Sequence, residues 1–143
     1  MSLGNIFDIA GSGMSAQTIR LNATASNLAN AETPAPNERE AYRARYPVFQ
    51  AIQAAVDSSI DGVNPSVGVK VTEVVESQKP LQARYEPEHP MADDEGYVFY
   101  PNVNVVEEMT NMISASRSFQ ANVDVMNATK VMMPSTALRS TAW

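Results

Sequence analysis

The chain has 143 residues, a formal net charge of −6 and no cysteine. That length fits one domain. The acidic balance argues against nucleic-acid binding, because phosphate recognition needs clustered lysine and arginine. The lack of cysteine excludes disulfide and thiolate chemistry. Only 18% of the residues are charged, below the share of about 25% that is usual in soluble domains, which indicates that part of the surface is covered in an assembly.

The first ten residues contain no lysine or arginine, so they lack the charged region of a cleaved signal peptide. A run of about 18 apolar residues is also absent, so we expect no segment that spans a bilayer. The sequence therefore predicts a protein that is soluble or is exported by a route other than the Sec pathway.

Residues 3–30 are predicted to form a helix with a narrow apolar seam. Large apolar side chains recur every seven residues, at Phe7, Met14, Leu21 and Leu28, which is the spacing of a coiled-coil seam. Most other positions are small or polar and few are charged. A solvated helix face would carry several ion pairs, so we expect the back of this helix to be covered as well.

Two glycines, Gly11 and Gly13, lie within this predicted helix. They lack the third glycine and the following lysine that a phosphate-binding loop requires. Each costs about 1 kcal/mol of helix stability relative to alanine. We expect them either to let neighbouring helices approach closely or to leave the first turns disordered until assembly.

Residues 104–133 repeat this design as a second helix. Its predicted seam consists of Val105, Met109, Met112, Phe119, Val123 and Met126, again close to heptad spacing. Asn104 and Glu107 resemble a capping box at its start. Pro134 is expected to end it, because proline cannot continue the hydrogen-bond ladder of a helix.

The residues between the two helices show β-type patterns. Thr33, Pro34 and Pro36 break the first helix, and residues 48–60 are expected to form a strand or a short helix. Apolar residues alternate with other residues in the segments 67–71 and 81–85, and residues 97–100 are β-prone. These patterns predict short strands, the last of them preceded by an acidic turn at residues 91–96.

Each predicted helix would span about 45 Å, longer than a compact domain of this size needs. We therefore predict an α+β fold in which long N- and C-terminal helices form an antiparallel coiled-coil stalk, with a small β-rich module inserted between them. The expected divisions are an N-terminal assembly helix (1–33), a linker and β-rich module (34–103), a C-terminal assembly helix (104–133) and a tail (134–143).

Residues with chemical potential are few. Asp93, Asp94 and Glu95 could hold a hard cation, but they lack the alternating ligand spacing of an EF-hand. His89 is the single histidine and has no nucleophile elbow to complete a catalytic triad. We therefore predict no catalytic, metal-binding or cofactor-binding residue.

The segment from Ser26 to Pro34, with the sequence Ser-Asn-Leu-Ala-Asn-Ala-Glu-Thr-Pro, resembles the signature near the N-terminus of the bacterial flagellar axial proteins, the family of rod, hook and hook-associated subunits. Residues 80–90, 94–98, 100–108, 111–119 and 122–127 are similar to the proximal rod members of that family. Within these motifs we expect Asn27 and Asn30, and opposite them Asn111 and Asn122, to satisfy backbone groups and neighbouring subunits without adding charge.

The resemblance implies a non-enzymatic structural subunit without a cofactor, which polymerises through its terminal helices into the axial tube that transmits motor torque. The partners that it implies are other copies of this chain, other rod proteins, the inner-membrane ring and adaptor proteins, and the export apparatus. It also implies type III export, without a cleaved signal peptide, into a basal-body rod that crosses the periplasm. The isolated helices are expected to be largely disordered, because two narrow seams bury too little surface to offset the ordering entropy.

Two alternatives remain open at this stage. The chain could be another flagellar axial subunit, although hook proteins carry a much larger insertion between their helices. It could also be a stand-alone helical hairpin that binds a partner peptide in its methionine-lined groove.

Overall fold

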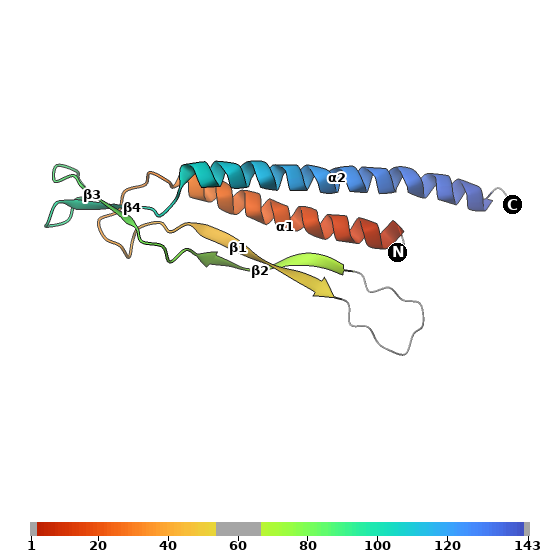
Figure 1. The fold of residues 1–143 in the computed structure, drawn as a ribbon, viewed down its shortest axis with the longest axis horizontal. Coiled ribbons are helices and arrows are strands. Elements are labelled where there is room, and N and C mark those ends of the chain that lie inside the picture. Colours follow the sequence, from red (N-terminus) through yellow and green to blue (C-terminus); the bar gives the residue numbers. More distant parts are fainter. Residues whose placement is uncertain (1–2, 54–66, 142–143) are drawn as a thin grey trace.

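The computed structural model describes residues 3–53 and 67–141, with side chains as far as Met133. The elements, in chain order, are α1 (Leu3–Ala29), β1 (Arg45–Gln53), β2 (Val67–Glu76), β3 (Gln82–Tyr85), β4 (Tyr97–Tyr100) and α2 (Val105–Thr141). The two long helices pack together in antiparallel directions, and the small antiparallel sheets lie between them in sequence (Figure 1). This confirms the predicted α+β fold with long terminal helices.

Small and polar residues form the contact between α1 and α2. Along α2, Glu108, Ala115 and Thr129 are buried and Asn122 is half-buried, each seven residues after the last. On α1, a Cβ atom added to Gly13 would lie 2.8 Å from Asn122 Nδ2. Because glycine carries no side chain, the two helix backbones approach closely at this point.

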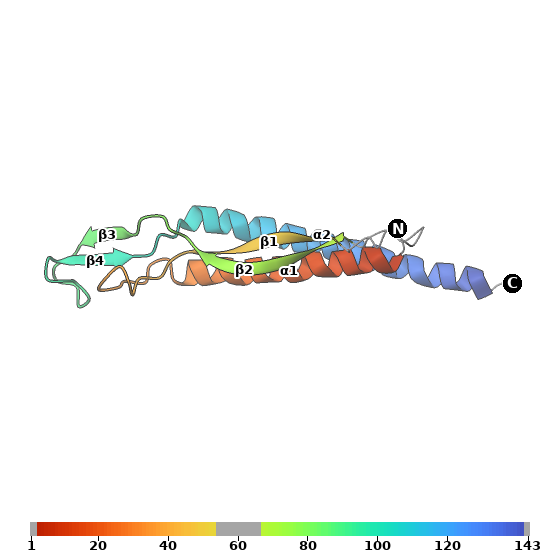
Figure 2. The ribbon, with the colours of Figure 1, turned by 90° about the horizontal axis from the view of Figure 1, so that it is seen from below.

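The hairpin of β1 and β2 lies beside α1 and extends along much of its length (Figure 2). The backbone N–H of Val69 donates a hydrogen bond to Ser12 Oγ at 3.1 Å, which joins the hairpin to the middle of the helix. The strand register shifts between Val48 and Phe49, a bulge that bends the ribbon. The hairpin therefore forms a third layer on α1. Residues 54–60 of the segment predicted as strand or helix lie outside the described residues.

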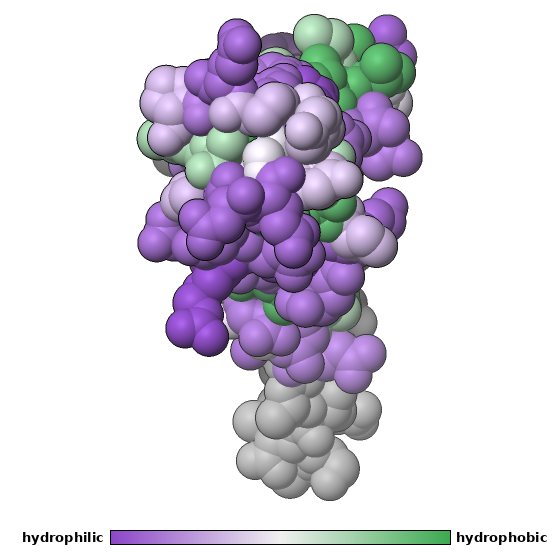
Figure 3. Space-filling model, turned by 90° about the vertical axis from the view of Figure 1, so that its left-hand side faces the viewer, coloured by the Kyte–Doolittle hydropathy of each residue, from purple (hydrophilic) through white to green (hydrophobic). Residues whose placement is uncertain are grey.

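The sheet of β3 and β4 forms the end of the molecule opposite the chain termini (Figure 1). The surface of this end is mainly hydrophilic (Figure 3). Asp93 Oδ1 accepts hydrogen bonds from the N–H groups of Glu95 and Tyr97, and Gly96 adopts a φ of 87°, a left-handed conformation that favours glycine. These contacts hold the acidic turn in its closed conformation.

The ends of α2 agree only in part with the sequence analysis. Asn104 Oδ1 accepts hydrogen bonds from the N–H groups of Val106 and Glu107, so the Asn104 half of the predicted capping box is confirmed. The prediction that Pro134 ends the helix is wrong, because α2 continues to Thr141. Proline removes the single hydrogen bond from its own nitrogen to the Lys130 carbonyl, and the helix is already well established before it. Over the described residues, neither helix combines the length and apolar character needed to cross a bilayer.

Candidate functional site

Asn27 is the centre of a buried polar cluster where α1 ends and α2 begins. Its side chain is fully buried. Asn27 Nδ2 donates to the Arg45 carbonyl at 2.9 Å and to Glu108 Oε2 at 3.1 Å, and its Oδ1 accepts from Tyr42 OH at 2.8 Å and from the Arg45 N–H at 2.9 Å. An asparagine amide has two donor hydrogens and two acceptor positions, so every one of them is used.

Glu108 is the second member of this cluster, and it too is fully buried. Its Oε1 accepts a hydrogen bond from Tyr46 OH at 2.8 Å, while its Oε2 accepts the bond from Asn27. Burial, followed by the hydrogen bond to Glu108, raises the pKa of Tyr46 to about 12. Tyr46 therefore keeps its proton and remains a hydrogen-bond donor to Glu108 throughout the physiological pH range.

This polar junction, defined by Asn27, Tyr42, Tyr46 and Glu108, joins four segments of the chain. Asn27 belongs to α1, Tyr42 to the loop that follows it, Tyr46 to β1 and Glu108 to α2. Since buried polar groups are costly unless paired, the network is complete only in one register of the two helices. We infer that the junction fixes that register.

Asn102 makes a similar connection just before α2. Its Oδ1 accepts from the Ala44 N–H at 2.8 Å, and its Nδ2 donates to the carbonyls of Ser77 and Lys79. It therefore holds the ends of β1 and β2 against the segment that leads into α2. Together with the small apolar cluster of Ala31, Ala44 and Val103, this contact ties the junction to the segments that flank it.

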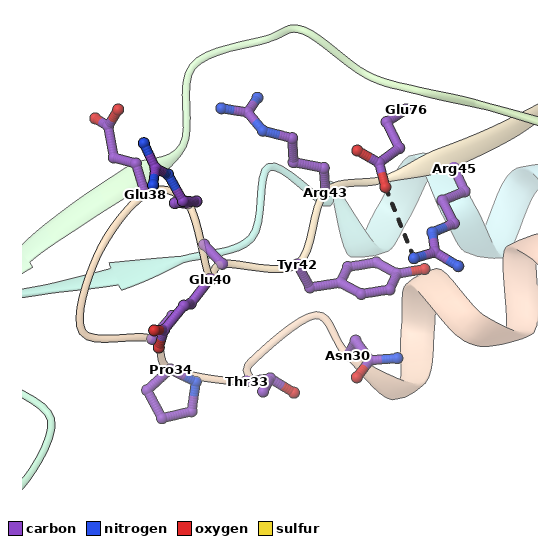
Figure 4. A pocket seen from close by; sticks show the side chains of 12 residues that line it. Asn30, Thr33, Pro34, Glu38, Glu40, Tyr42, Arg43, Arg45 and Glu76 are labelled. Atoms are coloured by element: carbon purple, nitrogen blue, oxygen red, sulfur yellow. Dashed lines mark ion pairs between the residues drawn. The ribbon is translucent and has the colours of Figure 1, made fainter.

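An open hollow of about 770 Å³ lies beside the junction, between the loop after α1 and the first residues of β1 (Figure 4). Its lining is mostly polar and includes Thr33, Tyr42 and Arg43. Arg45 pairs with Glu76 at 3.7 Å on its edge, and about half of each side chain is exposed. Such exposed pairs contribute little to stability.

The predicted seam residues lie beside the observed helix contact. Met14, Leu21 and Leu28 on α1 are half-buried, whereas Phe7 is 37% exposed. The predicted seam residues of α2 are half-buried except for Met109, which is 54% exposed; they are Val105, Met109, Met112, Phe119, Val123 and Met126. The contact itself runs through smaller side chains, because these let the helices approach more closely.

Both rows lie on the side of the helix pair that faces away from the hairpin. On α1, Ser12 contacts the hairpin, Gly13 contacts α2, and Met14 is the next residue. Since successive residues of a helix are rotated by about 100°, Met14 lies on the flank of the contact opposite to Ser12. On α2, Met112 follows Asn111, which contacts Arg20 across the helix pair. In an antiparallel pair, the residue that follows a contact residue lies on the same side of the pair in both helices, so Met112 faces the same way as Met14. We call this surface, formed by the two predicted rows, the apolar face.

The remaining predicted motif residues have contacts of three kinds. Asn30 Nδ2 donates to the Ser26 carbonyl at the end of α1. Asn111 Oδ1 accepts from the Arg20 guanidinium at 3.5 Å across the helix pair, and Asn122 Nδ2 donates to the Ser118 carbonyl within α2. Of the four motif asparagines, Asn27 alone is fully buried.

Sequence reasoning missed the importance of Glu108, Asn102 and the two tyrosines. A glutamate in the first turn of a helix is usually explained by the helix dipole, and nothing in the local pattern distinguishes Glu108 from Glu107. The residues considered for chemistry do structural work: His89 Nδ1 accepts a hydrogen bond from the Met91 N–H, and Asp93 closes its turn. Within the described part of the chain, no three histidine or acidic side chains gather as metal ligands.

Comparisons with known proteins agree over nearly the whole chain. The family described as flagella basal body rod protein matches residues 7–36, and the C-terminal family of flagellar basal body rod FlgEFG proteins matches residues 94–138. The flagellar basal-body rod protein FlgC of Escherichia coli O157:H7 is 53% identical over 133 residues, which cover 93% of this chain and 94% of that protein. FlgC of Salmonella typhimurium strain LT2 is 52% identical over the same lengths, and that of Aquifex aeolicus is 41% identical over 130 residues, 91% of each chain.

Proposed function

Because this chain belongs to the FlgC family of flagellar basal-body rod proteins and is therefore a structural rod subunit rather than an enzyme, we propose that it polymerises through its terminal helices into the axial tube that transmits motor torque. The apolar face is the observation that carries this proposal. A single chain leaves these large side chains only partly covered, although their rows extend along both helices.

Burial of the apolar face in a tube would contribute substantially to each subunit's stability. Full burial of a Leu, Met or Phe side chain is worth about 1.5–3 kcal/mol, so covering the exposed part of one such residue, about a third of it at most for the half-buried ones, contributes roughly 0.5–1 kcal/mol. Several of these contacts per copy, repeated along the tube, supply the stability that the small and polar helix contact lacks. The low charge content of the helices supports the same proposal.

The partners we propose are copies of this chain, other rod proteins, the inner-membrane ring with its adaptor proteins, and the export apparatus. We propose that the subunit passes through the flagellar type III apparatus and that the finished rod crosses the periplasm. The family assignment supports this route, and the absence of cysteine means that no disulfide has to form on the way.

The substitutions Phe119→Asp and Leu28→Asp test the proposal. Each buries an unpaired charge at a contact that is repeated in every copy, which costs several kcal/mol each time. We expect loss of rod assembly and of motility, with export of the variant chain unchanged. The exposed loop residue Gln78 supplies the control Gln78→Asp, which should swim normally. Normal swimming of either helix variant would contradict a role for the apolar face in polymerisation.

A further inference from the structure

We propose that adjacent copies in the rod contact one another edge to edge, with the outer face of α2 in one copy against the outer face of α1 in the next. This inference rests on the proposed function. The outer face of each helix is the side turned away from the contact between α1 and α2. It borders the apolar face, which flanks that contact, and Met109 lies where the two surfaces of α2 meet.

The outer face of α2 carries bulky apolar side chains in its first turns. Val106 is 72% exposed, Met109 54% and Ile113 56%. Val106 and Ile113 each precede a buried contact residue, Glu108 or Ala115, by two positions, which rotates them by about 200° around the helix. They therefore point away from α1, and because they recur at intervals of three and four residues they form one ridge.

The outer face of α1 has a different character, because most of its side chains are small, with the exposed Phe7 as a large side chain at its edge. Besides Asp8, its members are small or uncharged: Gly4, Gly11, Ser15, Thr18, Asn22, Ala25 and Ala29. A Cβ atom added to Gly11 would have no neighbour within 4 Å, whereas one added to Gly13 would meet Asn122. A glycine at position 13 is therefore explained by a close contact inside the chain. Gly11 also costs about 1 kcal/mol of helix stability, but no contact inside the described part of the chain requires a glycine there.

A ridge on one helix and a shallow groove on another are the two surfaces that interdigitate when helices pack. Here both surfaces belong to the same chain, on opposite edges of its helix pair. A contact between two different surfaces of identical copies is heterologous, so it repeats from copy to copy and generates a ring or a helical filament. A second copy of this chain therefore fits the ridge better than an unrelated partner does.

The size of this contact also favours a repeated assembly over an isolated pair. The 27 residues of α1 form a helix roughly 40 Å long and about 10 Å wide, so one face offers roughly 400 Å² and a pair of faces roughly 800 Å². Stable pairs of proteins usually bury about 1,200–2,000 Å². The contact is too small to hold two copies together alone, and it becomes effective when it repeats beside the apolar face in a tube.

Cysteine cross-linking in assembled rods tests the proposal, since the natural chain has no cysteine. Ile113→Cys would be combined in turn with Gly11→Cys, Ser15→Cys and Asn22→Cys, and each double variant and each single variant would replace the natural chain in cells. Ile113 and these α1 positions lie on opposite edges of the helix pair, beyond the reach of a disulfide within one copy. Isolated basal bodies would then be oxidised and separated by size under denaturing conditions.

We expect at least one double variant to give a ladder of dimers, trimers and longer oligomers, and the single variants to give none. Cross-linked dimers from a single-cysteine variant would indicate a symmetric contact and would overturn the proposal. Normally assembled rods without any cross-link would also overturn it but would leave the proposed function intact. Absence of the natural chain from isolated rods would instead refute the proposed function.

Gly11→Leu gives an independent measurement that does not depend on oxidation. The side chain enters open space within its own chain and improves helix propensity, so helicity by circular dichroism should equal or exceed that of the natural protein. The number of assembled rods should fall at least tenfold, because the groove is filled. Gly11→Ala is the smaller control, with rods retained. Normal rod numbers with Gly11→Leu would overturn the proposal whatever the cross-linking shows.

Discussion

The polar junction makes a quantitative prediction for the substitution Asn27→Ala. Asn27 is fully buried, and its amide makes four hydrogen bonds. Alanine would leave the backbone N–H and carbonyl of Arg45, the Tyr42 hydroxyl and one Glu108 oxygen without this partner. A typical hydrogen bond contributes about 0.5–1.5 kcal/mol net, and unpaired buried groups cost more. We therefore expect a loss of about 2–4 kcal/mol in the local stability of the junction.

Amide hydrogen exchange at Arg45 reports this loss directly, because the Arg45 N–H is the group bonded to Asn27 Oδ1. Each factor of ten in an equilibrium corresponds to about 1.4 kcal/mol, so the Arg45 amide should exchange roughly 30- to 1,000-fold faster in the Asn27→Ala variant. Asn30→Ala is the matched control, because Asn30 is half-buried and its amide makes a single bond to the Ser26 carbonyl. That variant should leave exchange at Arg45 unchanged. An increase of less than about threefold for Asn27→Ala would refute the junction as a determinant of local stability.

Two further predictions concern the β segments. Gly96→Ala should destabilise the β3–β4 end by about 1–3 kcal/mol, because φ is 87° there and a Cβ atom would lie 2.9 Å from the Tyr85 ring; unchanged exchange of the Tyr97 amide would contradict this. The pKa of Tyr46 is raised to about 12, so the folded chain keeps a proton that the unfolded chain releases near pH 10. Stability should therefore fall as pH rises from about 10 to about 12. Urea midpoints at about pH 9 and about pH 11 should show a larger fall for the natural protein than for Tyr46→Phe; equal falls would rule out this contribution.

The sequence was most informative about the elements with strong periodicity and clear caps. The heptad rows from Phe7 and Val105 and the cap at Asn104 correctly indicated two long helices that run antiparallel. The heptad rows did not single out the buried positions Glu108, Ala115 and Thr129, because the heptad rule ranks positions by large apolar side chains. In this pair Gly13, Ala115 and the buried polar residues allow a closer approach, and the large side chains are displaced to a flank.

The polar junction could not be predicted because its partners are distant in the sequence. Glu108 lies 81 residues from Asn27 and 62 from Tyr46, and no local periodicity relates them. Asn27 drew attention only as part of a motif, and its four hydrogen bonds depend on where the loop and β1 pass. At Pro134 the local rule itself was misleading. Proline usually ends a helix, but α2 continues through this residue to Thr141.

The antiparallel arrangement of α1 and α2 has a practical consequence for labelling. Leu3 and Thr141, the first and last residues of the helices, lie toward the same end of the molecule, while the β3–β4 turn lies at the other (Figure 1). A fluorophore or an affinity tag joined to either terminus would therefore sit beside the helices that we expect to be packed. An insertion in the exposed turn at Asp94 and Glu95 would stand at the far end, where it could report the position of each subunit without entering the contacts that build the rod.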